Sequence, residues 1–402
     1  MVNESAVAPH GTRTGKWFGF VVIAHAVSTA GNYLNLVALG LFTYEVTGSG
    51  LGVGLLMALR LAAGALGGVV AGRCAGRFGG RAMMIAADIA QAAAMVVLVL
   101  AADDVLVPAA AVVVLGAGNA VFSVALRTSV PEWVGQAARV RANSRLMAAR
   151  SLGTVAGFGS AGVVISSGGF GLAFTLNAAS FALSACMLAL VRPRNAHAQP
   201  VTTHDGRRFR PSASFPVLLL GMVALRGVDA LASSSHNVAL PVLASTIHAG
   251  DASAFLSRFW LAWAAGALLA QHVVRRWWRG HDPATGERLF AIGTCVMAVA
   301  FAAAFTGMPT LLLLLLALTA GLADGVTDIA YTSRLQETPH HLRGRLFGWS
   351  ATAETSGFAV GMVTAGVALE VLPAVAVVAL FHGLALCAAA GFLLFRNRGE
   401  RE

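Results

Sequence analysis

The chain has 402 residues, of which 57% are hydrophobic and only 11% are charged. A soluble globular domain carries about 25% charged residues, so this composition excludes a water-soluble protein and predicts a protein embedded in a lipid bilayer. The formal net charge of +10 would also suit a nucleic-acid-binding protein, and the positions of the basic residues decide against that class below.

Apolar runs of about twenty residues recur along the whole chain, and each is long enough to cross a hydrocarbon core roughly 30 Å thick. This pattern predicts an all-α polytopic membrane protein, because a spanning β-barrel would show segments of about ten residues with alternating polarity. In chain order we place twelve transmembrane helices at 17–45, 50–71, 82–101, 107–127, 143–166, 168–190, 215–245, 252–274, 287–306, 308–332, 346–370 and 373–395.

The basic residues lie on one side of this arrangement. Of the 28 Lys and Arg residues, 25 fall in the terminal segments, in the central linker, or in and beside the loops that follow even-numbered predicted helices. The other three, Arg60, Arg226 and Arg258, lie within predicted helices. The positive-inside rule then places both termini in the cytoplasm and predicts a multi-pass protein of the cell (inner or plasma) membrane. The positive charge is thus explained by topology, and we expect no nucleic-acid partner.

Two parts of the sequence repeat at nearly constant spacing. A shift of 202 residues lays AAGALGG (62–68) on AAGALLA (264–270), and a shift of 200 lays 144–158 on 344–358. Two six-helix halves are the organisation of a secondary transporter. The predicted domains are a cytoplasmic segment 1–16, a half 17–190, a cytoplasmic linker 191–214, a half 215–395 and a cytoplasmic tail 396–402.

The stretch GRCAGRFGGR (72–81) resembles the loop between helices 2 and 3 of the major facilitator superfamily, whose pattern is roughly G-x-L-A-D-R-x-G-R-K. Gly76 stands where the family has an acidic residue that helps to latch the outward-facing state, which puts that latch in doubt here. The stretches 28–60 and 335–345 resemble the branch that contains macrolide-efflux and siderophore-export proteins, and the resemblance covers 17–395. It implies a gating loop made of Gly72, Arg73, Gly76, Arg77, Gly79 and Arg81; alternatively, these arginines only anchor the topology.

Polar residues recur at helical spacing in the predicted helices 17–45 and 215–245, where each set forms one stripe. The resemblance implies that these two helices face a central cavity, together with 107–127 and 308–332. Alternatively, the polar groups only hydrogen-bond neighbouring helices. The candidate cavity residues are His25, Asn32, Asn35, Asn119, Arg226, Ser233, His236, Asn237 and Tyr331.

Acidic residues outnumber basic ones within the predicted spans. Arg226 and Asp229 are three residues apart on one helix and are predicted to pair. An acid left without a basic partner in the membrane is a candidate for binding and releasing protons. Asp324 and Asp328 lie one turn apart and are the first candidates for proton coupling, with Asp229 and Glu354 as further candidates.

The predicted function is secondary active transport by alternating access, in the form of proton-coupled efflux (antiport) of amphipathic small molecules such as multiple drugs or a secondary metabolite. An uptake symporter or facilitator for a polar solute is the alternative, and a membrane-embedded enzyme or lipid-handling subunit is the more distant one. No spacing typical of a nucleophile and its base or of metal ligands is present, so we expect no enzymatic activity, no cofactor and no metal. The expected partners are the substrate, protons and the lipid bilayer, with the chain acting as a monomer.

Overall fold

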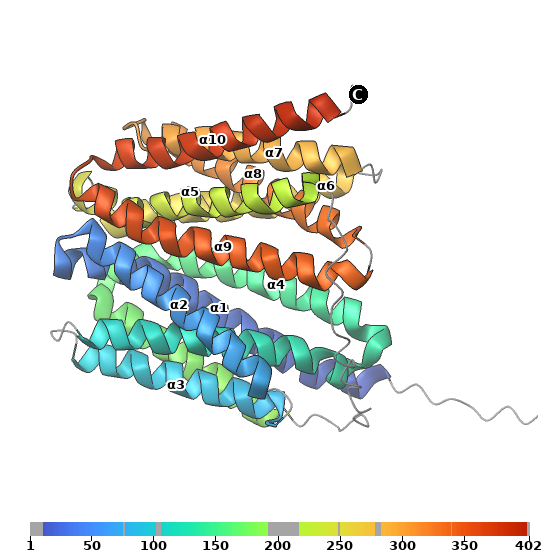
Figure 1. The fold of residues 1–402 in the computed structure, drawn as a ribbon. Coiled ribbons are helices and arrows are strands. Elements are labelled where there is room, and N and C mark those ends of the chain that lie inside the picture. The colour runs from blue at the N-terminus through green and yellow to red at the C-terminus, as the bar shows by residue number, and fades with distance from the viewer. Residues whose placement is uncertain are drawn as a thin grey trace, which may run out of the picture.

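The computed structural model of the chain describes residues 11–74, 77–101, 106–191, 217–247, 250–277, 283–338 and 340–399. All regular structure in these ranges is helical. In Figure 1 helices α1 to α4 form one half of a bundle and α5 to α10 form the other. The helices are α1 (Gly11–Thr47), α2 (Gly50–Cys74), α3 (Gly80–Leu100), α4 (Leu106–Leu190), α5 (Val217–Ile247), α6 (Ala252–Trp277), α7 (Pro283–Ala304), α8 (Thr310–Gln336), α9 (His340–Leu369) and α10 (Ala374–Gly399).

Ten segments of the described residues are long and apolar enough to span a membrane. They include one segment of 50 residues, Arg141–Leu190, within α4. They do not include α9, whose hydropathy is lowered by Glu354 and by several Thr, Ser and Gly residues. The chain is therefore a multi-pass membrane protein, with ten candidate spans where the sequence pattern predicts twelve helices.

Helix α4 folds back on itself. Ser129 and Leu188 would be about 90 Å apart in a straight helix that rises 1.5 Å per residue. Both nevertheless lie against the first turn of α3. A Cβ added to Gly80 would overlap the Ser129 side chain, and the Arg81 guanidinium donates to the Leu188 carbonyl.

One reversal of α4 occurs at Gly169, whose φ of 68° favours glycine. Before this residue, Gly153 and Gly157 contact α1 near Ala26 and Ala30. Phe170 and Phe174 then contact Phe42 further along α1, and Asn177 and Ser180 return to Gly31. The chain on the two sides of Gly169 therefore runs in opposite directions along α1.

The two halves pack tightly at one end of the bundle, shown at the left of Figure 1. There, α2 approaches α9 so closely that a Cβ on Gly54 would overlap the Met362 carbonyl. Between α4 and α6, the Ser257 hydroxyl donates to the Phe158 carbonyl, and the Phe158 ring stacks on Trp260 with centroids 5.4 Å apart. We call this the closed end.

At the end of the bundle opposite the closed end, hydrogen bonds and ion pairs join the helices within each half. In the first half, the Arg81 guanidinium donates to the carbonyls of Leu188 (2.9 Å) and Ala189 (2.5 Å) in the last turn of α4. The negative end of the helix dipole also favours a cation at this place. In the second half, Glu287 of α7 accepts from Arg334 of α8 (2.9 Å) and Arg396 of α10 (3.3 Å). The two halves thus use different chemistry at corresponding places.

Candidate functional site

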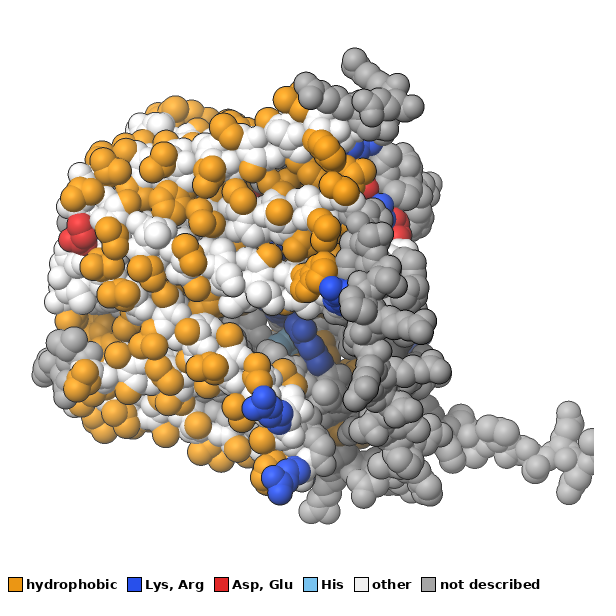
Figure 2. Space-filling model, in the orientation of Figure 1, with side chains coloured by type: hydrophobic (Ala, Val, Ile, Leu, Met, Phe, Trp, Pro, Cys, Tyr) orange, Lys and Arg blue, Asp and Glu red, His pale blue; other side chains and the backbone are white. Residues whose placement is uncertain are grey.

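A cavity of about 920 Å³ lies between the halves and is lined mainly by α1, α2 and α4. Its walls reach from Met57 and Met362, near the closed end, to Arg127 and Arg150 toward the opposite end. Figure 2 shows a hollow between the two halves, with Lys or Arg atoms visible inside it. The volume falls in the range typical of sites for drug-sized ligands.

The first-half candidates separate into two groups. His25, Asn32 and Asn119 line the cavity. Asn35 does not: its side chain is fully buried in the bundle, and its amide atoms make no hydrogen bond with the described residues. Of the polar residues predicted to face the cavity from the helix 17–45, His25 and Asn32 do so and Asn35 does not.

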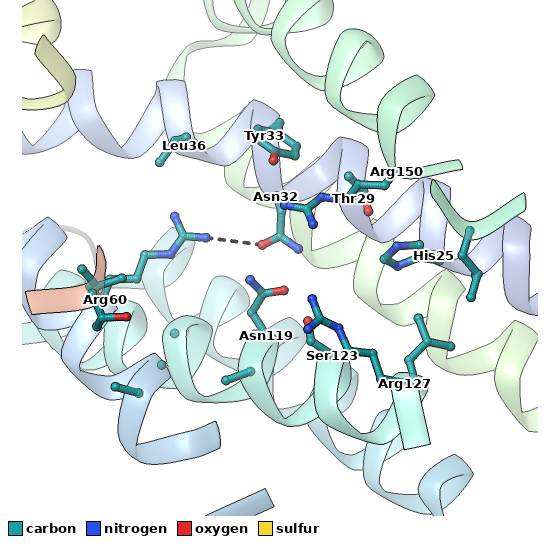
Figure 3. A pocket seen from close by; sticks show the side chains of 18 of the residues that line it. His25, Thr29, Asn32, Tyr33, Leu36, Arg60, Asn119, Ser123, Arg127 and Arg150 are labelled. Atoms are coloured by element: carbon teal, nitrogen blue, oxygen red, sulfur yellow. Dashed lines mark hydrogen bonds between the residues drawn. The ribbon is translucent and has the colours of Figure 1, made fainter. Parts of the chain in front are cut away.

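Three arginines join these residues, and sequence reasoning did not assign them to the cavity. Arg60, Arg127 and Arg150 line it, and their guanidinium groups point into the same space as Asn32 and Asn119 (Figure 3). One signal for Arg60 was available, since it is the only charged residue in the predicted helix 50–71. Arg127 and Arg150 belong to the basic residues in and beside the loop between the predicted helices 107–127 and 143–166, and the positive-inside pattern accounts for them without a role in the cavity.

The second-half candidates gather around Arg226 on α5. Its guanidinium lies 3.5 Å from Asp229, 3.5 Å from Asp328 and 3.2 Å from Glu354, so the predicted Arg226–Asp229 contact is one of three ion pairs. We call Arg226, Asp229, Asp324, Asp328 and Glu354 the Arg226 cluster. Glu354 is adjacent in sequence to Thr355, which lines the cavity, but none of the five cluster members, Arg226 included, is among the described residues that line it.

Tyr331 adjoins the Arg226 cluster and is buried. Its hydroxyl donates to the Ser350 hydroxyl at 2.7 Å, and its ring centroid lies 5.7 Å from the Arg226 guanidinium carbon. It braces the arginine and does not appear among the cavity-lining residues.

His236 and its neighbours do not line the cavity, in contrast to the expectation from the sequence. The buried His236 ring stacks on Phe301, with centroids 3.6 Å apart, and its Nδ1 lies 3.1 Å from His382 Nε2. The Asn237 amide donates to the Ser233 carbonyl at 2.8 Å. The His236–His382 contact joins α5 to α10, which is the alternative that the sequence left open, and the Asn237–Ser233 hydrogen bond lies within α5.

The predicted gating loop is described in part. Gly76 lies outside the described residues. Arg73 and Arg77 are exposed, and the backbone N–H of Arg77 donates to the Cys74 carbonyl at 2.9 Å. Arg81 contacts the end of α4 in its own half, as described above, and so acts within that half.

Glu370 joins the two halves at the outermost part of the closed end. Its carboxylate accepts hydrogen bonds from the Leu51 backbone N–H (3.0 Å) and the Ser49 hydroxyl (2.7 Å). These hydrogen bonds lower the pKa of Glu370 below its ordinary value. The start of α2 also favours a negative charge through the helix dipole, so this carboxylate is well suited to hold the closed end.

Among the described residues, no group of three or more His, Cys, Asp or Glu side chains is arranged to hold a metal ion. The imidazoles of His236 and His382 lie together, and no third such side chain in the described ranges joins them.

Comparison with solved structures gives the same fold. The nucleoside transporter NupG superposes with a TM-score of 0.71 at 14% identity, covering 94% of this chain and 98% of that one. A bacterial homologue of the human lysosomal transporter Spinster, in an inward-facing and occupied conformation, gives 0.72 at 14% identity, covering 96% and 97%. The POT family transporter PepTSo gives 0.74 at 10% identity, covering 96% and 99%. Identities this low establish the fold alone.

Sequence comparison gives the family. Among curated proteins, none matches this chain. The sequence model of the Major Facilitator Superfamily matches residues 21–362, which is most of the chain. The match assigns the superfamily and does not assign the macrolide-efflux and siderophore-export branch within it. The chain belongs to the major facilitator superfamily and is a transporter, not an enzyme.

Proposed function

We propose that the chain is a secondary active transporter that works by alternating access and exports amphipathic small molecules in exchange for protons. The observation that carries this proposal is the cavity between the two halves, which has both polar and apolar walls and is sealed by tight packing at one end. A solute in this cavity would exchange sides when the halves rock about it.

The proposal includes twelve membrane spans in two halves, 17–190 and 215–395, joined by the linker 191–214. The folded-back α4 would supply three spans and α9 one. The arginine-rich loops would face the cytoplasm, together with both termini. The cavity would then open to the cytoplasm, and the conformation described here would be inward-facing.

Cysteine labelling tests this topology. Val371, beside the closed end, is 79% exposed, and Phe78, between α2 and α3, is 58% exposed. In intact cells a membrane-impermeant maleimide should label Val371→Cys and spare Phe78→Cys, and permeabilised cells should label both. The four native cysteines are replaced beforehand. Labelling of Phe78→Cys in intact cells would reverse the proposed orientation.

Proton coupling is proposed for the Arg226 cluster because four carboxyl groups surround one guanidinium. Asp229, Asp328 and Glu354 each make an ion pair with Arg226. Asp324 is the member with no ion pair among the described residues, although it contributes to the charge around Arg226. Asp324 is therefore our first candidate for the carboxyl that binds and releases a proton, ahead of Asp328.

Uphill transport by membrane vesicles tests coupling and function together. Inside-out vesicles with an acidic lumen are offered fluorescein, rhodamine 123 and Nile red, which are anionic, cationic and neutral. The parent should accumulate at least one dye. Asp324→Asn should lose at least tenfold of this accumulation and keep dye exchange without a gradient, because exchange does not need the proton.

The control is Asp251→Asn, which alters an exposed carboxylate whose partner is Arg258 (3.2 Å), and it should accumulate dye as the parent does. Asp328→Asn, Asp229→Asn and Glu354→Gln locate the coupling within the cluster. If Asp324→Asn pumps normally and another of these variants does not, the coupling carboxyl is the other one. If all four pump normally, the cluster does not couple protons.

A further inference from the structure

The wall of the cavity formed by the first half is basic. Arg60, Arg127, Arg150 and His25 all line it, and no Asp or Glu is among the described residues that do. The acids of the Arg226 cluster belong to the other half, where they surround a cation of their own. The described second-half residues that line the cavity, Thr355 and Met362, are uncharged, so the charge on its walls comes from the first half.

Arg60 is enclosed in the bundle and makes no ion pair with the described residues. Its Nη2 lies 3.5 Å from the Asn32 Oδ1, and its Nη1 is buried without a hydrogen-bond partner in the described part of the chain. By contrast, Arg226 contacts three carboxylates, and Arg334 and Arg396 share Glu287. A guanidinium enclosed in a membrane protein without a counterion is costly, and such a residue by default marks a functional site.

Arg60 is also held in place for binding. The Asn32 amide donates from Nδ2 to the Ser28 carbonyl at 3.0 Å, which leaves its Oδ1 directed at Arg60. Asn119 and Ser123 point into the same cavity from α4 (Figure 3). An acid group bound to Arg60 would thus find further hydrogen-bonding groups around it, while Leu36, Met57 and Met362 supply apolar surface.

We propose that this cavity binds an organic anion whose acidic group pairs with Arg60, while Arg127 and Arg150 draw the anion in from the open end. The inference deepens the proposed transport function by naming its substrate class, and it rests on the same cavity. A bidentate contact between a guanidinium and a carboxylate, sulfonate or phosphate would supply the charge partner that Arg60 lacks. A cationic drug would meet three like charges on this wall.

Ligand binding to the purified full-length chain in detergent tests the inference without requiring transport. The probes share one naphthalene ring: 2-naphthoate, 2-naphthalenesulfonate and 2-naphthyl phosphate as anions, 2-naphthylmethylamine as the cation and 2-naphthylmethanol as the neutral compound. A ligand that binds the folded state raises the midpoint of thermal unfolding in a saturable way. At least one anion should do so, and the cation and the alcohol should not.

Arg60 is then varied. Arg60→Gln should weaken anion binding at least tenfold, and Arg60→Lys should keep part of it because the charge remains. Arg258→Gln is the control, since this exposed arginine already pairs with Asp251, and it should bind as the parent does. If Arg60→Gln does not fold, Arg60→Lys and the double variant Arg127→Gln/Arg150→Gln test the inference instead. Both should bind the anions more weakly than the parent does.

The inference is overturned if the cation stabilises the protein and the anions do not, if none of the anions stabilises it, or if Arg60→Gln binds them as the parent does. Its failure is distinct from failure of the proposed function. Anion binding that depends on Arg60, combined with vesicles that pump no dye, would refute proton-driven efflux and leave the binding site intact. Pumping of rhodamine 123 alone, without anion binding, would refute the anion site and support proton-driven efflux.

Discussion

Replacing Arg226 by glutamine should abolish uphill transport and lower the free energy of unfolding by about 3 to 5 kcal/mol, the usual cost of removing one partner from a buried ion pair. In the described part of the chain, Arg226 is the one cation in contact with Asp229, Asp328 and Glu354. The Asp229 side chain is only 5% exposed, so it would be left as an enclosed and uncompensated charge. Thermal unfolding in detergent and dye accumulation in vesicles measure the two effects.

A double variant separates stability from transport. Arg226→Gln/Asp229→Asn removes the guanidinium together with its most enclosed acid, and it should regain at least half of the lost stability. It should remain unable to pump, because Asp328, Glu354 and Asp324 would still lack the cation that organises them. A single Arg226→Gln variant as stable as the parent would show that the cluster holds its charge in another way.

Substitution of Gly54 by alanine should reduce transport at least tenfold by preventing the closed end from forming. The new Cβ would overlap the Met362 carbonyl and lie 3.3 Å from the Gly366 Cα, and both groups are backbone atoms that side-chain rotation does not move. Since alternating access must pass through the closed arrangement, the variant should remain open at this end. A Met57→Cys reporter in the cavity should then react faster with an impermeant maleimide applied outside.

The matched control is Gly68→Ala on the same helix, where the nearest contact of the new Cβ is the Ala120 Cβ at 3.9 Å. Alanine favours a helix over glycine by about 1 kcal/mol, so this variant should be at least as stable as the parent and transport normally. Equal transport by Gly54→Ala and Gly68→Ala would mean that α2 and α9 separate enough in every state to admit the methyl group.

The placement of the helices follows closely from the sequence because the bilayer sets their length. The predicted segment 50–71 matches α2 (Gly50–Cys74), and the predicted break between 166 and 168 lies close to the reversal at Gly169. Hydropathy alone is less informative where polar groups lie inside the bundle. It finds ten candidate spans among the described residues and omits α9, which carries Glu354 of the Arg226 cluster.

The contacts within the site could be predicted only in part. The Arg226–Asp229 pair is local, three residues apart on one helix, and periodicity was enough to predict it. The contacts of Arg226 with Asp328 and Glu354 join residues 102 and 128 positions apart, which no local pattern encodes. The placement of His236 against His382 depends likewise on the packing of α5 on α10, 146 positions away.

The basic wall around Arg60 also has an electrical consequence. The electrical potential across a bacterial or plasma membrane is negative on the cytoplasmic side. The free energy of one elementary charge changes by about 2.3 kcal/mol per 100 mV when it crosses. An organic monoanion carried outward moves down this field, and a proton carried inward moves charge in the same sense. Each cycle would then transfer two charges, so a transporter of this kind would register as a current, and the voltage across the membrane would drive it even when the pH is equal on both sides.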